Sequence, residues 1–201
     1  MTNRNTINTV GYYDTNADAF FDQTIGVDMT PLYARFLAHV PPGGHIVDAG
    51  CGSGRDAKAF LERGYQVSAF DASAELAQRA SRLLSIPVQC RRFDEIAEVE
   101  SYDAIWACAS LLHVGKADLP VAVAQLTRSL RVGGVLYASF KHGVGERIDA
   151  NGRYFTDMTS DVLQALVNHV GRLKLLESWQ TGDRRGDRPA ELWQNILVFK
   201  C

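Results

Sequence analysis

The chain has 201 residues, of which 46% are hydrophobic and 22% are charged, and its formal net charge is −2. This length is typical of one domain that can bury a core, and the composition is ordinary for a soluble globular protein. The near-neutral charge excludes the large basic field with which a protein binds nucleic acid unaided, so we do not expect nucleic acid as a partner. The sequence shows neither an apolar run that could span a membrane nor an N-terminal signal pattern, so we expect a cytoplasmic protein that does not bind membranes.

The four cysteines indicate the same compartment. Cys51, Cys90, Cys108 and Cys201 form no Cys-x-x-Cys pair and no spacing typical of a metal site. We therefore expect reduced, half-buried thiols, with no disulfide framework and no bound metal.

The first predicted elements form an aromatic lead-in. Residues 11–21 are predicted to be partly helical, and a clearer helix is predicted over residues 30–40, with Pro31 at its first position. The aromatic side chains of this segment either pack against the domain or close over a ligand as a lid (Tyr12, Tyr13, Phe20 and Phe21). We therefore divide the chain into a helical lead-in or lid, residues 1–34, and a main domain, residues 35–201.

A glycine-rich loop follows the first predicted strand. Residues 46–56 indicate a short buried strand, a loop with glycine at every second position, and the start of a helix over residues 55–63. Gly50, Gly52 and Gly54 permit backbone angles closed to other residues and allow a ligand to approach the main chain closely. A strand, glycine loop and helix in this order are typical of a nucleotide-binding element.

Two acidic residues indicate which nucleotide binds. The G-x-G-x-G spacing differs from the G-x-G-x-x-G of dinucleotide sites, and the loop lacks the Gly-Lys-Ser/Thr of a P-loop. Asp48, at the end of the first strand, would repel a phosphate and suits a cationic or amino-bearing ligand. Asp71 ends the next strand, residues 67–71, and lies 17 residues beyond Gly54, where an acid can accept hydrogen bonds from both ribose hydroxyls. These features predict a site for S-adenosylmethionine, a ribose nucleoside with a cationic, amino-bearing tail and no phosphate.

Strands and helices alternate along the rest of the chain. Apolar and capping patterns predict three further helices, the last opened by Thr159 and ended by Gly171 (residues 73–84, 118–130 and 159–170). Apolar runs predict four further strands, the last two as a hairpin (residues 87–90, 135–140, 173–180 and 192–200). This alternation predicts an α/β fold whose mainly parallel sheet has helices on both faces.

Five short motifs, in this order, resemble those of the class I S-adenosylmethionine-dependent methyltransferases over roughly residues 35–200. They are the glycine loop, a ribose motif, an adenine-side motif, the fourth strand and the turn into the fifth (residues 48–54, 70–73, 92–94, 102–110 and 130–136). The resemblance implies a Rossmann-like, doubly wound fold with a seven-stranded, mainly parallel sheet and an antiparallel last strand. It also implies S-adenosylmethionine as cofactor and a small-molecule substrate, as in the quinone-pathway and tellurite-resistance group.

The two acids and the glycine loop have expected roles toward this cofactor. Asp71 is expected to bind the ribose hydroxyls through charge-assisted hydrogen bonds. Asp48 is expected to orient the amino end through the loop backbone or a water molecule. The main chain of Gly50 and Gly52 is expected to hold the methionine tail.

Other residues are expected at the ends of the cofactor. Phe93 or Asp94 is expected to meet the adenine, with Asp94 accepting a hydrogen bond from its exocyclic amine. Arg55 either binds the cofactor carboxylate or is an exposed arginine at the start of a helix. The leading Tyr-Asp of related methyltransferases implies that Tyr13 closes over the methionine end. The remaining expected contacts are Ala49, Cys51, Ala72 and Ala109.

Candidates for acid–base catalysis follow the fourth and fifth strands. His113 and His142 each lie where a strand ends, and a histidine that titrates near neutrality can take a proton from a substrate. The alternative, which we favour slightly for both, is that the side chain caps a helix or is hydrogen-bonded in packing.

Two loops are candidates for substrate contact. Residues 143–155 are predicted to form a long loop whose most usable side chains are Arg153 and Tyr154, the latter a third catalytic candidate. Residues 182–188 carry arginines that suit an anionic substrate, but the interleaved aspartates favour a solvated hairpin tip.

The motifs that the chain lacks reduce the range of substrate classes that we expect. The fourth strand ends in Ala-Cys-Ala-Ser over residues 107–110, without the Asn/Asp-Pro-Pro-Tyr/Phe of amino-methylating nucleic-acid enzymes or the Pro-Cys of cytosine C5 enzymes. We therefore expect methyl transfer to an O, N, S or soft heteroatom of a small molecule. The alternatives are a tRNA or protein side-chain methyltransferase that works with a partner, and a non-catalytic S-adenosylmethionine-binding module. The acceptor, the general base and the choice between monomer and homodimer stay open.

Overall fold

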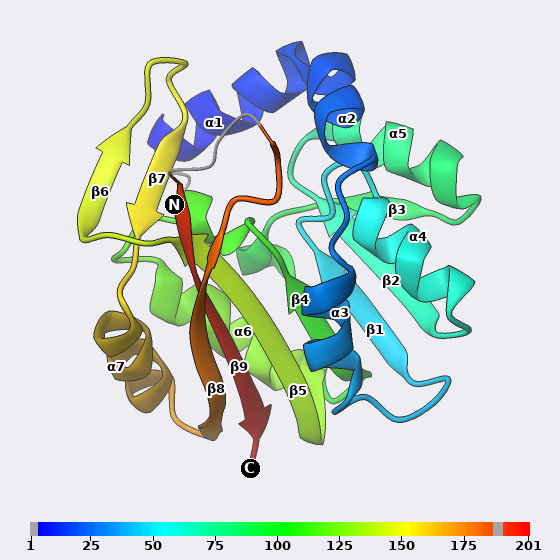
Figure 1. Ribbon diagram of the computed structural model, residues 1–201, viewed down its shortest axis with the longest axis vertical. Helices are drawn as coiled ribbons and strands as arrows, with labels where there is room; N and C mark the ends of the chain where they lie inside the picture. The colour runs from blue at the N-terminus through cyan, green and yellow to red at the C-terminus, as the bar shows by residue number, and fades with distance from the viewer. Residues whose placement is uncertain (1–3, 187–190) are drawn as a thin grey trace.

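The structure is a computed structural model that describes residues 4–186 and 191–201. Seven strands form one sheet in the order β3-β2-β1-β4-β5-β9-β8, in which β9 is antiparallel to both of its neighbours (Figure 1). The bounds are β1 His45–Ala49, β2 Gln66–Asp71, β3 Val88–Cys90, β4 Tyr102–Ala107, β5 Leu130–Lys141, β8 Leu173–Gly182 and β9 Leu192–Lys200. The predicted fold class, including the antiparallel last strand, is confirmed.

Helices cover both faces of the sheet because its central strands are apolar on both sides. Ile46 of β1 packs with Trp106 of β4 on one face, and Val47 packs with Ile105 on the other. This is the two-residue period of a strand that is buried on both faces. The first face carries α3, α4 and α5, and the second carries α6 and α7. The bounds are α3 Thr30–Leu37, α4 Arg55–Glu62, α5 Ala74–Leu84, α6 Leu119–Ser129 and α7 Ser160–Val170.

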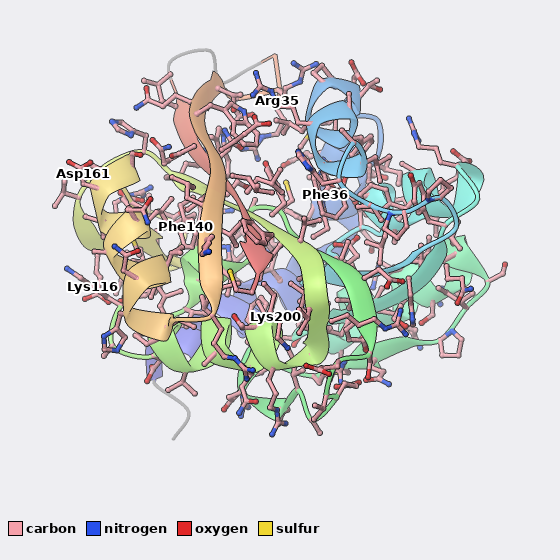
Figure 2. The ribbon with its side chains drawn as sticks, turned by 90° about the horizontal axis from the view of Figure 1, so that it is seen from below. Arg35, Phe36, Lys116, Phe140, Asp161 and Lys200 are labelled. Carbon is pink, nitrogen blue, oxygen red and sulfur yellow. The ribbon has the colours of Figure 1, made fainter. Side chains whose placement is uncertain are left out.

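The helix ends follow the predicted capping chemistry. Thr159 accepts a hydrogen bond from the backbone N–H of Val162, and Gly171 ends α7 with φ of +71°. Seen from below, Phe36 of α3 and Phe140 of β5 lie within the layers, whereas Asp161 of α7 lies on the outside (Figure 2). The described residues contain no helix that is both long and apolar enough to cross a lipid bilayer.

The lead-in forms two helices, α1 Arg4–Thr15 and α2 Ala17–Ile25, which cross the edge of the sheet where the parallel strands end (Figure 1). Asp14 of α1 accepts hydrogen bonds from Ser73 Oγ at 2.6 Å and from the backbone N–H of Glu75 at 3.3 Å, and so joins α1 to the start of α5. The predicted division at residue 35 falls inside α3, whose Phe36 lies in the core of the main domain.

The prediction of a long loop over residues 143–155 was wrong. Strands β6 Gly145–Ile148 and β7 Tyr154–Asp157 pair antiparallel and form a separate two-stranded sheet. Asp149 makes the turn, because its Oδ1 accepts the backbone N–H groups of Asn151 and Arg153 at 2.9 Å. Most of β6 is exposed, so the segment lacks the apolar alternation by which a strand is recognised in sequence.

Candidate active site

The glycine loop is tied to the tip of β2. The N–H groups of Gly50 and Cys51 donate to the carbonyl oxygen of Phe70 at 2.9 and 3.0 Å, and Gly52 N–H donates to Asp71 Oδ2 at 2.8 Å. Gly50 has φ of +79°, and a Cβ built on it would lie 2.4 Å from Ser110 Cβ. Glycine is therefore required at position 50 by both the backbone angle and the space.

Asp71 lies at the point where the loop meets the second strand. Its Oδ1 accepts the backbone N–H of Ser73 at 2.9 Å, while Oδ2 accepts that of Gly52. Burial raises the pKa of Asp71, and the charge of Asp14 adds to the rise, although the two backbone N–H groups oppose it. The carboxylate keeps lone pairs for ligand hydroxyls, since each of its oxygens can accept more than one hydrogen bond.

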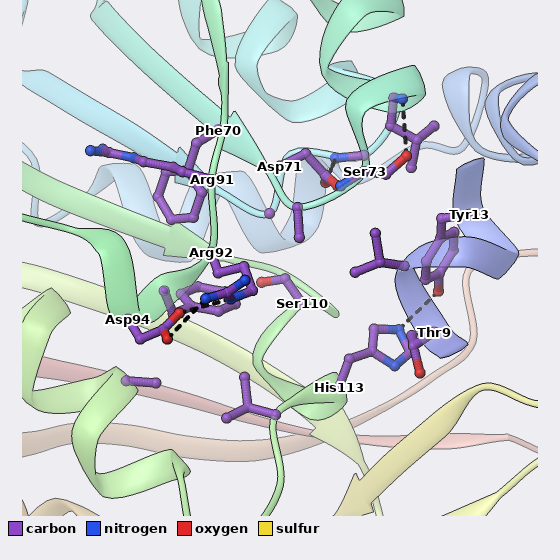
Figure 3. A pocket seen from close by; sticks show the side chains of 18 of the residues that line it. Thr9, Tyr13, Phe70, Asp71, Ser73, Arg91, Arg92, Asp94, Ser110 and His113 are labelled. Carbon is purple, nitrogen blue, oxygen red and sulfur yellow. Dashed lines mark hydrogen bonds and ion pairs between the residues drawn. The ribbon is translucent and has the colours of Figure 1, made fainter. Parts of the chain in front are cut away.

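A cavity of about 320 Å³, which we call cavity A, opens beside Asp71 (Figure 3). Phe93 packs edge-on against Phe70, with ring centroids 5.5 Å apart. Arg92 Nε donates a hydrogen bond to Asp94 Oδ1 at 3.0 Å. That hydrogen bond lowers the pKa of Asp94. The predicted cofactor contacts that line cavity A are Tyr13, Gly50, Gly52, Asp71, Ala72, Phe93, Asp94 and Ala109.

A second cavity of about 380 Å³, cavity B, adjoins the first. The two share a set of lining residues, which we call the junction: Tyr13, Phe20, Gly50, Gly52, Ala109 and His113. Ala109 has φ of +52°, and its N–H donates to Ser139 Oγ at 2.8 Å. A non-glycine residue held at positive φ is uncommon and is typical of functional sites. Cavity B also contains two predicted cofactor contacts, Cys51 and Arg55.

Arg55 is part of a buried network around Asp56. Its Nε and Nη2 donate to the two Asp56 oxygens at 2.6 and 2.9 Å, and Asp56 also accepts from Tyr33 Oη and Trp106 Nε1. The side chain of Arg55 is only 18% exposed, so the alternative of an exposed arginine was wrong.

Asp48 and Ala49 lie behind the loop rather than in either cavity. Asp48 Oδ2 accepts the backbone N–H of Ala57 at 3.0 Å, and the carbonyl oxygen of Ala49 accepts from Ser110 Oγ at 2.6 Å. Burial, reinforced by the charge of Asp56, raises the pKa of Asp48 well above its usual range. From this position, Asp48 can act on a ligand through the loop backbone but not by direct contact.

The hydrogen bonds of His113 fix its tautomer. Nδ1 lies 2.7 Å from the carbonyl oxygen of Tyr154, which can only accept, so Nδ1 carries the proton. Nε2 lies 2.8 Å from the hydroxyl of Tyr13 and accepts from it (Figure 3). Burial lowers the pKa of His113 to about 4 and raises that of Tyr13 to about 12. His113 is therefore a neutral acceptor at physiological pH.

The burial of His113 predicts that the protein loses stability in mild acid. The pKa of His113 falls from 6.5 to about 4 on folding, so below pH 6.5 the unfolded chain binds a proton that the folded chain does not. The free energy of unfolding should therefore fall as the pH drops from 6.5 to 4, by about 2–3 kcal/mol from this group. Urea unfolding across this range should show a flatter pH dependence for His113→Gln than for the wild type. His169→Gln, at an exposed histidine of α7, is the control, and equal pH dependence in the wild type and His113→Gln would contradict the assignment.

The other two catalytic candidates are not brought to the cavities. His142 is exposed and its Nδ1 lies 3.2 Å from Gln180 Nε2. The Tyr154 hydroxyl bonds to Glu146 of β6, so the side chain is directed away from the junction while its carbonyl oxygen holds His113. Neither residue lines cavity A or cavity B.

Phe20, which the sequence offers as either a packing or a lid residue, lies at the junction, where a Cβ on Gly52 would be 3.0 Å from its ring. Sequence reasoning missed the roles of two other residues that shape the site. Ser139 lies within a predicted strand, and its Oγ accepts a hydrogen bond from Ala109 N–H, 30 residues away in sequence. No local sequence pattern predicts this contact. The side chain of Asp183, expected at a solvated tip, is instead only 3% exposed and accepts hydrogen bonds from Arg185 and Trp193. The remainder of that predicted tip, residues 187 and 188, lies outside the described residues.

Comparison with known proteins agrees with this geometry. A family described as "Methyltransferase domain" matches residues 46–134, which run from β1 to the start of β5. Malonyl-[acyl-carrier protein] O-methyltransferase of Salmonella typhimurium is 33% identical over 93 residues, 45% of this chain and 36% of the relative. The same enzyme of Serratia marcescens is 33% identical over 100 residues, 49% of this chain and 38% of the relative. The chain thus spans well under half the length of these relatives.

Solved structures share the fold over nearly the whole chain. The Burkholderia thailandensis 1,6-didemethyltoxoflavin-N1-methyltransferase, with 1,6-didemethyltoxoflavin and S-adenosylhomocysteine bound, has a TM-score of 0.78 at 22% identity and covers 97% of this chain and 86% of its own. The [4+2]-cyclase SpnF has a TM-score of 0.72 at 14% identity and covers 94% of each chain. At these identities the likeness shows the fold alone. The chain is thus similar to methyltransferases in sequence over residues 46–134, and it shares their fold over nearly its whole length.

Proposed function

We propose that the chain transfers the methyl group of S-adenosylmethionine to a small molecule bound in cavity B. The observation that carries this proposal is the junction, because two cavities that share their lining let two ligands meet. When bound, the cofactor supplies a methyl group on a sulfonium, which brings its own leaving group. The protein has then to hold the acceptor in line with that methyl group.

The lining of cavity A fits the adenosine part of the cofactor. Asp71 is our candidate for the ribose hydroxyls, and Phe93 and Asp94 for the adenine. The main chain of Gly50 and Gly52 is our candidate for the methionine tail, which would then reach the junction. These roles are supported by the carboxylate at the tip of β2 and by a loop too close to Ser110 to carry a side chain at position 50.

Tyr13 is our candidate for closing over the methionine end. Its ring lies at the junction and contacts Phe20 and His113, with ring centroids 5.0 and 5.4 Å away. The helix that carries it is attached to the main domain by Asp14 and by Thr9, whose Oγ1 accepts from Tyr154 N–H at 2.9 Å. We therefore propose that α1 and α2 act as the lid.

The names of the relatives support a small acceptor without fixing the atom. One group of relatives is named as O-methyltransferases of a malonyl group, and the toxoflavin enzyme as an N1-methyltransferase. A cyclase with the same fold favours a second candidate, in which this chain binds its ligands without methyl transfer. The neutral state of His113 is compatible with either function.

Calorimetry separates the cofactor from other nucleotides. S-adenosylmethionine and S-adenosylhomocysteine should bind with micromolar affinity, and NAD should not bind at the same concentrations. Release of S-adenosylhomocysteine on addition of small-molecule mixtures, detected by mass spectrometry, would then establish transfer. Binding of NAD in place of both ligands would overturn the proposal, and tight binding without any transfer would favour the second candidate.

A further inference from the structure

Cavity B has a surplus of cationic side chains although the whole chain has a net charge of −2. Its acidic lining residues are Asp56, Asp149, Asp183 and Glu191. Its basic lining residues are Arg55, Lys141, Arg147, Arg153, Arg184 and Arg185. Arg147 and Arg184 pair with Asp157 and Asp28, which lie outside the lining, so the space is walled by six cationic side chains that are already held in place. Such a wall suits a ligand that brings a group able to accept hydrogen bonds from guanidinium ions.

Arg153 is the cation best placed to meet a ligand at the junction. Its Nε and Nη2 donate to Asp149 Oδ2 at 3.0 and 2.7 Å, and its guanidinium lies 4.8 Å from the ring centroid of Tyr12. The side chain is only 12% exposed. Its charge is close enough to oppose the rise in the pKa of Tyr13 and to add to the fall in the pKa of His113, both of which burial causes. Because the guanidinium is already held in one orientation, binding an anion costs little side-chain entropy.

A second guanidinium, that of Arg147, lies over the ring of Phe155, which Arg153 also contacts. Arg147 of β6 pairs with Asp157 through Nε at 2.6 Å and lies 4.6 Å from the ring centroid of Phe155, which also lies 5.3 Å from Arg153. Phe155, Trp193 and Tyr13 add aromatic surface to the lining. A cavity of about 380 Å³ with such walls fits a flat apolar body that carries one anionic group.

The described side chains at the junction are poor proton acceptors. Nε2 of His113 is occupied by the Tyr13 hydroxyl, and Nδ1 already carries its proton. Cys108, in the lining of cavity B, lies with its Sγ 3.7 Å from Ser139 Oγ, and burial raises its pKa to about 12. An acceptor that reacts here must therefore arrive with a free lone pair, because the junction offers it no efficient base.

We propose that the acceptor is an aromatic carboxylate, that its carboxylate is the group methylated, and that Arg153 binds it at the junction. One carboxylate oxygen forms the new O–CH₃ bond as the S–CH₃ bond breaks, and the electron pair of that bond goes to sulfur. The products are a methyl ester and S-adenosylhomocysteine, and no proton is gained or lost. The assignment rests on the proposed function, because it names the substrate class of the same site.

The test compares 2-naphthoate with 2-naphthamide, which has the same shape but no charge. Calorimetry on the protein loaded with S-adenosylhomocysteine should show the carboxylate binding about 10- to 150-fold more tightly than the amide, as expected for a charge-assisted hydrogen bond. With S-adenosylmethionine, methyl 2-naphthoate should form at a rate that is flat between pH 6 and 9. An acceptor that must lose a proton would instead react faster as the pH rises.

Variants of Arg153 identify the residue responsible. Arg153→Gln should remove the preference for the carboxylate while the affinity for S-adenosylhomocysteine stays unchanged, and Arg153→Lys should retain part of the preference. Arg82→Gln, at an exposed arginine of α5, is the matched control. Equal binding of acid and amide, or no binding of either to a protein that binds S-adenosylhomocysteine, would overturn the carboxylate assignment alone. A wild-type protein that fails to bind S-adenosylhomocysteine would instead overturn the proposed function.

Discussion

Replacing Asp71 by alanine is expected to weaken the binding of S-adenosylhomocysteine about 10- to 150-fold, which corresponds to the loss of one or more charge-assisted hydrogen bonds to the ribose. The effect should be large because Asp71 lines cavity A and also holds the loop through Gly52 N–H. Calorimetry at constant pH and salt concentration gives the dissociation constants of both proteins.

The Asp71 experiment needs two controls. Asp161→Ala removes a carboxylate from the exposed first turn of α7 and should leave the affinity unchanged. Thermal unfolding of ligand-free Asp71→Ala shows whether the hydrogen bond from Gly52 N–H to Asp71 stabilises the fold as well as the bound ligand. An unchanged affinity in Asp71→Ala would mean that the ribose lies elsewhere.

Substitution of Gly50 by alanine should destabilise the protein more than the same substitution at Gly64. Both glycines have positive φ, +79° and +84°, so each variant should lose about 1–2 kcal/mol through backbone strain. A Cβ at Gly64 has nothing within 4 Å, whereas one at Gly50 overlaps Ser110. The overlap should add about 1–3 kcal/mol, the usual range for overpacking. Urea unfolding of the two variants measures the difference.

A second substitution isolates the overlap at Gly50. Ser110→Gly removes the Cβ with which the new methyl group collides, so the double variant should recover stability relative to the sum of the single ones. Because Ser110 Oγ also donates to the Ala49 carbonyl oxygen, Ser110→Gly must be measured alone to complete the cycle. If Gly50→Ala and Gly64→Ala lose equal stability, the close approach of the loop to Ser110 is unimportant.

The cofactor half of the molecule could be predicted from sequence because its signals are local. The glycine spacing, the acid at position 71 and the apolar runs at residues 46–47 and 135–140 each depend on a few neighbouring residues. The structure brings the loop and Asp71 together because adjacent parallel strands end at the same edge of the sheet.

The lining of cavity B could not be predicted in the same way, because its geometry depends on contacts between distant segments. The pair of Tyr13 and His113 spans 100 residues, and that of Lys141 and Asp183 spans 42. Burial keeps His113 neutral, and the Asp183 side chain is only 3% exposed, and no sequence pattern reveals either fact. Nor does the exposed β6 carry the apolar period of a strand, and for this reason the sequence predicts a loop where the structure has a hairpin.

The attachment of the β6–β7 hairpin has a consequence for how such a protein can diversify. His142 and Met158, on either side of the hairpin, form a bridge, and Met158 N–H donates to the carbonyl oxygen of Lys141 at 2.9 Å. The ends of the hairpin are thus fastened where β5 finishes. The ends of the segment between them are therefore already held together. Lengthening or exchanging that segment adds little to the entropic cost of closing it and leaves the seven-stranded sheet intact. Under the proposed function, new acceptor preferences can therefore arise by insertion or exchange within residues 143–157 while the residues around cavity A keep their sequence.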